Sequence, residues 1–435
     1  MMRWDDVCER VRLTYSGPDV VGRFVIDSRE AGPGDLFFAL PGGRTHGGLF
    51  CEQAEQAGAT CVVPPRFAAE GRVVVPRVAA ALWDASKVRR ETFERPVVAV
   101  TGSVGKTTTR RAVAAVLRAT GPVCESPANF NNALGVPLTL GGLRPEDRFS
   151  VVEIGTSAPG EVASLSRLVR PDVAVVTAVC ESHLSGLKTV ERVASEKWSV
   201  RAGRPDSALF CGPDAVVGQP SEATLVAPEA ESIVTSLEGT RFSWGQREWL
   251  IGTPGRQFAA AGAIAAAIGR HFGIDRSAAD AALRSLVPTP RRCEVHVVRG
   301  RTIIDDTYNA NPTSTRAAGR LLADLSSDRR VLVLGAMADL DAASDDLHRR
   351  TAADLRECGD ELWLVGDAAE AYASGWGGPL RRFSAASEAG RAGAESLAAG
   401  ESILFKASRS GGLDRGVDAM LAALHGQGSR LPTRR

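Results

Sequence analysis

The stretch "RPVVAVTGSVGKTTTRRAVAAVLRAT", residues 95–120, contains three local patterns in the order that decides the fold. The apolar run at 97–100 predicts a buried strand, and the apolar residues of 112–117 predict an amphipathic helix. A loop with two glycines joins them. This order is typical of a parallel sheet covered by helices, so we expect an α/β protein.

The loop "TGSVGKTTT" (101–109) favours a phosphate-binding site. Between a strand and a helix, backbone N–H groups and the helix N-terminus can surround phosphate oxygens. Lys106 would bridge the outer phosphates of a nucleotide, and the Thr107 hydroxyl would hold Mg²⁺. The spacing is shorter than that of the full GxxxxGK[ST] pattern, because position 100 is Val. An ordinary helix N-cap with a solvated Lys106 is the alternative.

A second lysine lies where an aliphatic residue is expected. The chain has only five lysines, and one of them, Lys197, falls within "VERVASEKWSV" (190–200). On a helix it shares the apolar stripe of Val190, Val193 and Ala194, which should face a core. An amine there is either functional or a side chain that extends along apolar surface to reach water.

Two further candidates follow the next predicted strands. Glu153 lies at the end of the apolar strand in "FSVVEIG" (149–155), and His183 comes shortly after "PDVAVVTAV". Singly, Glu153 could be a salt-bridge partner and His183 a helix cap. Ligands collect where neighbouring strands of a parallel sheet end, and Mg²⁺ prefers oxygen ligands. The sequence therefore predicts a metal site made by four residues: Thr107, Glu153, His183 and Lys197.

The alternation of strands and helices divides the chain into three predicted domains. Residues 1–92 predict a small α/β domain, and residues 93–287 predict a P-loop ATPase-like parallel sheet that ends in helices at 257–270 and 276–286. The stretch "VPTPRR" (287–292) predicts a proline-stiffened linker. Residues 288–435, with the apolar strands "RTIIDD", "RRVLVLGAM", "ELWLVGDA" and "SILFKAS", predict a Rossmann-like α/β domain.

Composition excludes several classes of protein. The net charge is +1, from 52 basic and 51 acidic residues, so nothing in it indicates a nucleic-acid partner, and we expect none. The longest apolar run, "FAAAGAIAAAIG" (258–269), is too short to span a bilayer, so we expect no membrane insertion. Eight scattered cysteines without a CxxC pair indicate reduced thiols. We therefore expect a cytoplasmic protein, and we expect a monomer.

Several longer motifs resemble one known family. The segments "DSREAGPGDLFFAL" (27–40), "NFNNALGVPLTL" (129–140), "DDTYNANPTST" (305–315) and "ILFKASRS" (403–410) join the glycine loop in the order and spacing of the Mur ligases. These are ATP-dependent amide-forming enzymes of peptidoglycan synthesis. The chain is most similar to the MurF type, which joins D-alanyl-D-alanine to UDP-N-acetylmuramoyl-tripeptide.

The resemblance implies a mechanism and its cofactors. ATP would phosphorylate the terminal carboxylate of the UDP-linked peptide, and the amine would attack the resulting acyl phosphate. Two Mg²⁺ ions are implied, together with a carbamate formed from CO₂ on Lys197. Arginine could not replace that lysine, because a carbamate requires an amine that burial can make neutral.

The resemblance also assigns roles to individual residues. Lys106, His183, Lys197 and Arg292 would be catalytic, and the metal ligands would be Thr107, Glu153, His183 and the carbamate on Lys197. The ATP contacts would be Gly102, Ser103, Val104, Gly105, Lys106, Thr107, Thr108, Arg292, Asp306, Tyr308 and Asn309. The substrate contacts would be Asp27, Ser28, Arg29, Asn129, Asn131, Asn132, Lys406, Ser408 and Arg409. A hinge salt bridge for Arg292 and polar turns for the asparagine and DSR segments are the alternatives.

Several positions depart from the family pattern. Phe258 and Ala261 stand where the family carries adenine-contacting asparagines. The segments "HGG" (46–48), "GTSAPGE" (155–161) and "GAMADLD" (335–341) are also altered, and the stretch 198–255 is shorter than is typical. Two alternative functions remain. One is a divergent Mur-type ligase that uses another amino-acid or carboxylate substrate, and the other is an inactive nucleotide-binding scaffold.

Overall fold

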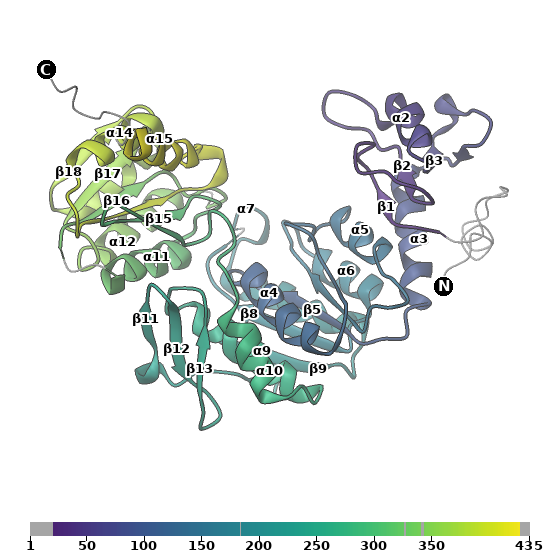
Figure 1. Cartoon of the computed structure of the whole chain (residues 1–435), viewed down its shortest axis with the longest axis horizontal. Helices are drawn as coiled ribbons and strands as arrows, with labels where there is room; N and C mark the ends of the chain where they lie inside the picture. Colours follow the sequence, from purple (N-terminus) through teal and green to yellow (C-terminus); the bar gives the residue numbers. More distant parts are fainter. Residues whose placement is uncertain (1–20, 183, 326–327, 341–342, 427–435) are drawn as a thin grey trace, which may run out of the picture.

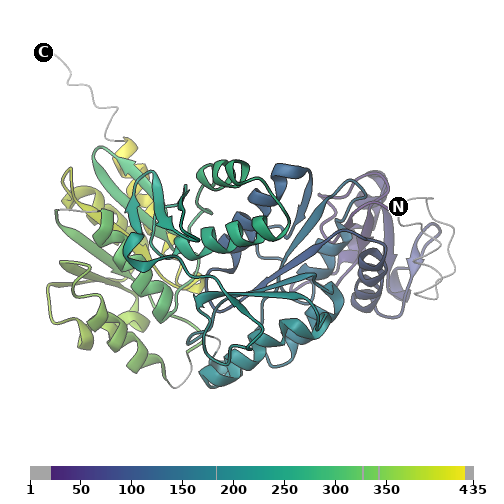
Figure 2. The same cartoon turned by 90° about the horizontal axis from the view of Figure 1, so that it is seen from below.

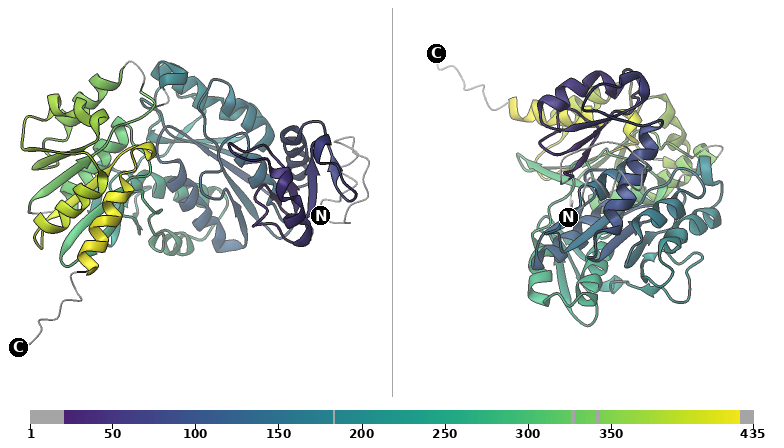
Figure 3. Two further views of the ribbon diagram at one scale, coloured as in Figure 1. Left: turned by 90° about the horizontal axis from the view of Figure 1, so that it is seen from above. Right: turned by 90° about the vertical axis from the view of Figure 1, so that its right-hand side faces the viewer.

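The computed structural model describes residues 21–182, 184–325, 328–340 and 343–426. Three α/β units follow one another along the chain, with the first and the third at opposite ends of an elongated molecule (Figure 1). The view from above shows the same order, with the central unit between the other two (Figure 3). The α/β fold expected from the sequence is confirmed.

The first unit is a small parallel sheet with strand order β1-β2-β3-β4. Its strands are β1 (Phe24–Val25), β2 (Leu36–Phe38), β3 (Thr60–Val63) and β4 (Val73–Val74). Its helices are η1 (Gly47–Phe50), α2 (Cys51–Gln56), η2 (Pro65–Phe67) and α3 (Val78–Glu91). The apolar face of α3, with Leu82 fully buried, covers the sheet.

Two arginines at the end of α3 join the first unit to the central one. Arg89 donates to the carbonyl oxygens of Val21 and Leu143, and Arg90 donates to those of Val169 and Arg170. Both guanidinium groups are buried, and burial lowers their pKa values, to about 10 for Arg89. The carbonyl partners compensate the burial of most of these donors, whereas Arg89 Nε has no hydrogen-bond partner among the described residues.

The central unit is a six-stranded parallel sheet with order β10-β9-β8-β5-β7-β6. Its strands are β5 (Val97–Thr101), β6 (Val123–Glu125), β7 (Phe149–Glu153), β8 (Val173–Ala178), β9 (Ala208–Asp214) and β10 (Thr224–Leu225). Its helices are α4 (Lys106–Leu117), η3 (Arg118–Thr120), α5 (Gly135–Gly141), α6 (Glu161–Val169), α7 (Leu184–Leu187), α8 (Val190–Trp198), η4 (Ser199–Gly203), α9 (Phe258–His271) and α10 (Arg276–Arg284). Two separate apolar clusters, one containing α4 and α9 and the other α5, α6 and α8, cover its two faces.

A three-stranded antiparallel sheet in the region 230–251 was not expected from the sequence. It consists of β11 (Val234–Ser236), β12 (Gly239–Ser243) and β13 (Glu248–Ile251), preceded by η5 (Ala230–Ser232). It packs between α9 and the third unit (Figure 2). Gly262 of α9 makes this possible, because a Cβ there would lie 2.7 Å from the ring of Phe242.

The third unit is a six-stranded sheet with order β14-β15-β19-β16-β17-β18, in which only β14 is antiparallel to its neighbour. Its strands are β14 (Glu294–Val298), β15 (Arg301–Asp306), β16 (Arg330–Leu334), β17 (Glu361–Val365), β18 (Leu380–Phe383) and β19 (Ser402–Lys406). Its helices are α11 (Pro312–Leu325), α12 (Ser344–Asp354), η7 (Asp367–Tyr372), α13 (Ala373–Trp376), α14 (Ala386–Ser396), η8 (Arg409–Gly411) and α15 (Asp414–Gly426).

The predicted linker 287–292 contains no helix or strand and separates α10 from β14. Among the described residues, no helix combines the length and the apolar character needed to cross a membrane.

Candidate active site

The glycine loop connects β5 to α4. Gly102 and Gly105 have φ values of 143° and 81°, in the region that favours glycine, and Gly105 directly precedes the first residue of the helix. A side chain at Gly102 would collide with the Thr177 hydroxyl, which itself donates to the Val104 carbonyl oxygen at 2.5 Å. The loop is therefore held against β8 with its backbone exposed at the start of α4, the arrangement that binds anions.

Lys106 lies on this loop and faces charges from two other elements. Its Nζ donates to the carbonyl oxygens of Gly102 and Ser103, at 2.7 and 3.3 Å. Burial lowers the pKa of Lys106, while the negative charge of Glu153 raises it and the positive charge of Arg292 lowers it further. The charges of Glu153, at the end of β7, and of Arg292, in the linker, therefore both act on the Lys106 amine.

Glu153 is a buried carboxylate with one oxygen held in place. Its side chain is 1% exposed, and Oε1 accepts a hydrogen bond from Asn131 Nδ2 at 2.9 Å. Oε2 lies 3.4 Å from a guanidinium nitrogen of Arg110 and has no hydrogen-bond partner among the described residues. A buried carboxylate oxygen without a hydrogen bond is a suitable ligand for a hard cation.

Lys197 is fully buried, as the apolar stripe predicted. Its exposure is 0%, and its Nζ has no hydrogen-bond partner among the residues that the structure describes. Burial lowers its pKa well below the usual value, and the charge of Lys106 lowers the pKa further. An unpaired amine in this setting favours the neutral form.

Thr107 and His183 are the two remaining predicted metal ligands. Thr107 is buried on the first turn of α4. His183 lies outside the described residues, between β8 and α7. Thr107, Glu153 and Lys197 are thus all buried, and their role as metal ligands stays a prediction; the donor types would fit Mg²⁺ if Lys197 carried a carboxylate.

The linker contributes Arg292 to this region. Its guanidinium lies 3.9 Å from the ring centre of Tyr308, and Arg409 approaches the same ring at 5.6 Å. Its Nε has no hydrogen-bond partner among the described residues. Stacking on an aromatic ring orients the guanidinium without occupying its donors.

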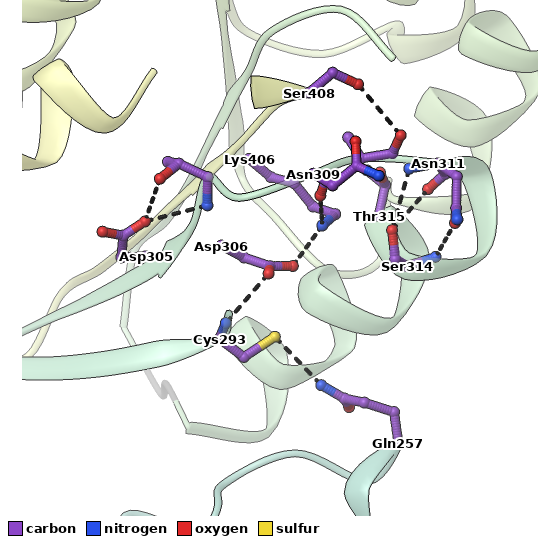
Figure 4. Close-up of polar contacts among 12 residues, drawn as sticks. Gln257, Cys293, Asp305, Asp306, Asn309, Asn311, Ser314, Thr315, Lys406 and Ser408 are labelled. Atoms are coloured by element: carbon purple, nitrogen blue, oxygen red, sulfur yellow. Dashed lines mark hydrogen bonds and ion pairs between the residues drawn. The ribbon is translucent and has the colours of Figure 1, made fainter. Parts of the chain in front are cut away.

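Sequence reasoning missed a polar network next to the linker (Figure 4). Gln257 Nε2 donates to Cys293 Sγ at 3.4 Å, and the Cys293 backbone N–H donates to Asp306 Oδ1 at 3.2 Å. Lys406 Nζ donates to Asp306 Oδ2 at 2.5 Å and to the Asn309 carbonyl oxygen at 2.9 Å. No local signal could have revealed partners so far apart in the chain.

This network bears on two predicted roles. Both carboxylate oxygens of Asp306 are engaged, and Lys406 is only 1% exposed. Ser408 is also buried, and its Oγ accepts from the Ala338 backbone N–H at 2.8 Å. The ATP contact of Asp306 and the substrate contacts of Lys406 and Ser408 therefore stay predictions.

The predicted substrate residues of the first unit form local contacts. Arg29 pairs with Asp27 at 2.5 Å, and its hydrogen bonds lower the pKa of that carboxyl to about 2. Ser28 Oγ donates to Gln53 at 2.7 Å. These contacts are equally compatible with a polar turn, so the substrate role stays a prediction.

One of the three asparagines after α4 contacts a predicted metal ligand. Asn131 contacts Glu153, whereas Asn132 Oδ1 accepts from the backbone N–H groups of Leu134 and Gly135, at 3.1 and 2.9 Å, at the start of α5. Asn129 is exposed. Of the three, only Asn131 links the predicted substrate side to a predicted metal ligand.

One other group of metal-ligating side chains lies elsewhere in the described part of the chain. Glu294, His296 and Asp305 come together on β14 and β15. Arg291 binds two members of this group: its backbone N–H donates to Glu294 at 2.9 Å, and its guanidinium pairs with Asp305 at 3.0 Å. The group is therefore explained as an ion-pair cluster.

Models of known protein families match three consecutive parts of the chain. They are the Mur ligase family catalytic domain at residues 23–100, the Mur ligase middle domain at 100–243, and the Mur ligase glutamate ligase domain at 291–409. In the structure, a parallel sheet with a glycine loop is followed by a linker and a second sheet. This order agrees with the order of the matches. The chain belongs to the Mur ligase family.

Curated relatives specify the branch of the family. A Synechocystis protein is 31% identical over 92% of both chains, and an Escherichia coli protein is 32% identical over 81% of this chain and 82% of its own. Both are named UDP-N-acetylmuramoyl-tripeptide–D-alanyl-D-alanine ligase. The chain is thus a MurF-like Mur ligase.

Solved structures agree with this placement. A crystal structure of MurF from Acinetobacter baumannii superposes with a TM-score of 0.85 at 26% identity, over 96% of this chain and 98% of that one. MurF from Thermotoga maritima in complex with ADP superposes with a TM-score of 0.79 over 94% and 99% of the two chains. At 24% identity, the second likeness supports the fold.

Proposed function

We propose that the chain joins D-alanyl-D-alanine to the terminal carboxylate of UDP-N-acetylmuramoyl-tripeptide, using ATP, in peptidoglycan synthesis. The observation that carries the proposal is the glycine loop at the start of α4, where the charges of Glu153 and Arg292 both act on Lys106, together with the buried Lys197 amine, which has no hydrogen-bond partner among the described residues. The relatives named for this reaction cover nearly the whole chain.

The chain's own residues would position and neutralise the reacting phosphate. The loop N–H groups and the N-terminus of α4 would bind the phosphates, as in other glycine loops. Lys106 would leave the carbonyl oxygens of Gly102 and Ser103 and reach the outer phosphates. Arg292, oriented by Tyr308, would approach from the linker and stabilise negative charge.

Thr107, Glu153, His183 and Lys197 would hold two Mg²⁺ ions. When bound, these ions neutralise charge on the transferring phosphoryl group and orient its oxygens. The neutral Lys197 amine would add to CO₂ and release one proton, so that a carbamate replaces the amine. The burial of Nζ without a hydrogen-bond partner among the described residues supports this step, because burial disfavours the charged ammonium, which cannot react with CO₂.

We further propose roles for the three units. Residues 1–92 would bind the UDP-linked substrate, 93–287 would bind ATP, and 288–435 would bind the amine substrate and close over ATP. Arg292 and Tyr308 belong to the third unit and its linker, so movement of that unit would complete the site.

We also propose that the enzyme is a monomer and that it acts in the cytoplasm. The seven cysteines of the described residues are all free, which suits a reducing compartment. Lys106, Glu153 and Arg292, whose charges influence one another, all come from one chain.

The decisive experiment measures phosphate release from ATP by the purified chain. We expect release that requires both UDP-N-acetylmuramoyl-tripeptide and D-alanyl-D-alanine, with the amide product seen by mass spectrometry. Release with a different amino acid would assign the chain to another Mur-type reaction. No release with any amine, despite nucleotide binding, would indicate a scaffold.

A further inference from the structure

We propose that Arg110 is a positioning residue, which ties the loop 126–132 to the carboxylate of Glu153 and so fixes the orientation of that carboxylate. The inference rests on the proposed function, in which Glu153 is a metal ligand. It assigns a role to a residue that neither the glycine-loop motif nor the metal set includes.

Arg110 lies one turn after Thr107 on α4 and is 4% exposed. Its Nε donates to Glu125 Oε1 at 3.0 Å, and its Nη1 donates to the Ala128 carbonyl oxygen at 2.8 Å. The same Nη1 lies 3.4 Å from Glu153 Oε2. One guanidinium therefore reaches the end of β6, the loop that follows it and the end of β7.

The loop and the carboxylate are also joined from the other side. Asn131 donates from its side chain to Glu153 Oε1 at 2.9 Å, and its carbonyl oxygen accepts from the Gly155 N–H at 2.7 Å. Ala128 has a φ of 43°, an unfavourable value for a residue with a Cβ. Arg110 Nη1 donates to this strained residue and contacts Glu153, so one nitrogen links the loop to the carboxylate.

The chemistry at this position requires arginine. A planar guanidinium presents several donors in fixed directions and can reach three acceptors at once. A lysine would keep the charge and could satisfy only part of this set. Substitution by lysine therefore separates positioning from charge, and it avoids leaving the buried Glu153 without any positive partner.

The chain offers a matched control. Arg118 pairs with the other oxygen of Glu125, at 2.7 Å, but its side chain is 47% exposed and does not pair with Glu153. Arg118→Lys thus changes the same kind of residue beside the same glutamate. Glu125→Gln is a second variant, which loosens Arg110 without removing it.

The experiment measures Mn²⁺ binding in the presence of ADP by electron paramagnetic resonance, together with kcat, KM and thermal unfolding. For Arg110→Lys we expect Mn²⁺ binding weakened about 10- to 100-fold, as for other partners of metal ligands. Glu125→Gln should weaken binding in the same direction. Arg118→Lys should bind Mn²⁺ as the unchanged protein does, and all three should unfold cooperatively.

The outcomes separate this inference from the proposed function. Unchanged Mn²⁺ binding in Arg110→Lys, with binding lost in Glu153→Gln, would overturn the positioning role alone. Unchanged binding and turnover in Glu153→Gln would overturn the proposed metal role. Should Arg110→Lys fail to fold, Glu125→Gln decides: normal Mn²⁺ binding there would overturn the inference.

Discussion

Lys197 and Lys406 are both buried lysines, but their surroundings differ in kind. Lys406 is paired with Asp306 at 2.5 Å, whereas the Lys197 amine has no hydrogen-bond partner among the described residues. An unpaired buried charge is costly, so an amine like that of Lys197 loses its proton instead. The two positions are therefore suited to different chemistry: Lys406 to structure, and Lys197 to modification.

Lys197→Ala tests this distinction by activity. We expect turnover to be abolished, because the proposed carbamate oxygens are lost, and partly restored by small organic acids or added bicarbonate. The measurement is phosphate release from ATP with both substrates. Lys87→Ala, at an exposed position of α3, is the control and should retain activity. Full activity of Lys197→Ala without additives would contradict the carbamate proposal.

At the scale of elements, α12 holds the loop that follows β16 through one histidine. His348 is 1% exposed, and its Nε2 accepts from the Met337 N–H at 2.9 Å. Its Nδ1 therefore carries the proton and donates to the Ser344 carbonyl oxygen at 2.6 Å. The arrangement requires the neutral ring, and burial lowers the pKa of His348 from its ordinary 6.5, although nearby Asp345 opposes the shift.

This predicts a loss of stability in mild acid. The unfolded chain binds a proton at His348 below about pH 6.5 while the folded chain does not, so the free energy of unfolding falls as the pH drops through that range. Well above pH 6.5, where His348 is neutral in both states, the group contributes no pH dependence. The measurement is urea unfolding between pH 5.5 and 7.5.

His348→Gln provides the comparison for this prediction. The variant should be less stable at pH 7.5, because the Met337 N–H loses the well-placed acceptor that His348 Nε2 provides. It should nevertheless lose less stability on acidification than the unchanged protein. Equal pH dependence in both proteins would rule out His348 as the responsible group.

At the scale of the whole molecule, the candidate site is shared between the central unit and the third unit. Lys106 and Arg292 come from different units, and Gln257 at the start of α9 contacts Cys293 beyond the linker. The base of the nucleotide would lie on the α9 side of this junction. Phe258 and Ala261, both buried, offer no side-chain hydrogen bond there.

We therefore predict weak discrimination between ATP and GTP. Without side-chain donors and acceptors directed at the base, the two nucleotides differ little in binding energy. The measurement is kcat/KM for each nucleotide at saturating substrates. A preference of a hundredfold or more, about 2.7 kcal/mol, would contradict the prediction.

Much of the fold followed from local patterns. The apolar run 97–100 became the fully buried β5, and the helix predicted at 257–270 is α9, Phe258–His271. The stripe that contains Lys197 is buried at Val193 and Ala194. Period and burial are encoded within a few residues, so these elements and the position of an unusual amine could be predicted without tertiary information.

The sequence by itself thus determined the α/β class, the glycine loop and the family, because these depend on local periodicity and on motifs. Only the tertiary structure decided which side chains meet. The antiparallel sheet β11–β13 is made of strands of three to five residues, too short for a clear period. The pairs Asp306–Lys406 and Arg110–Glu153 join residues 100 and 43 positions apart. Such contacts arise when packed strands bring distant segments together, and no local pattern contains that information.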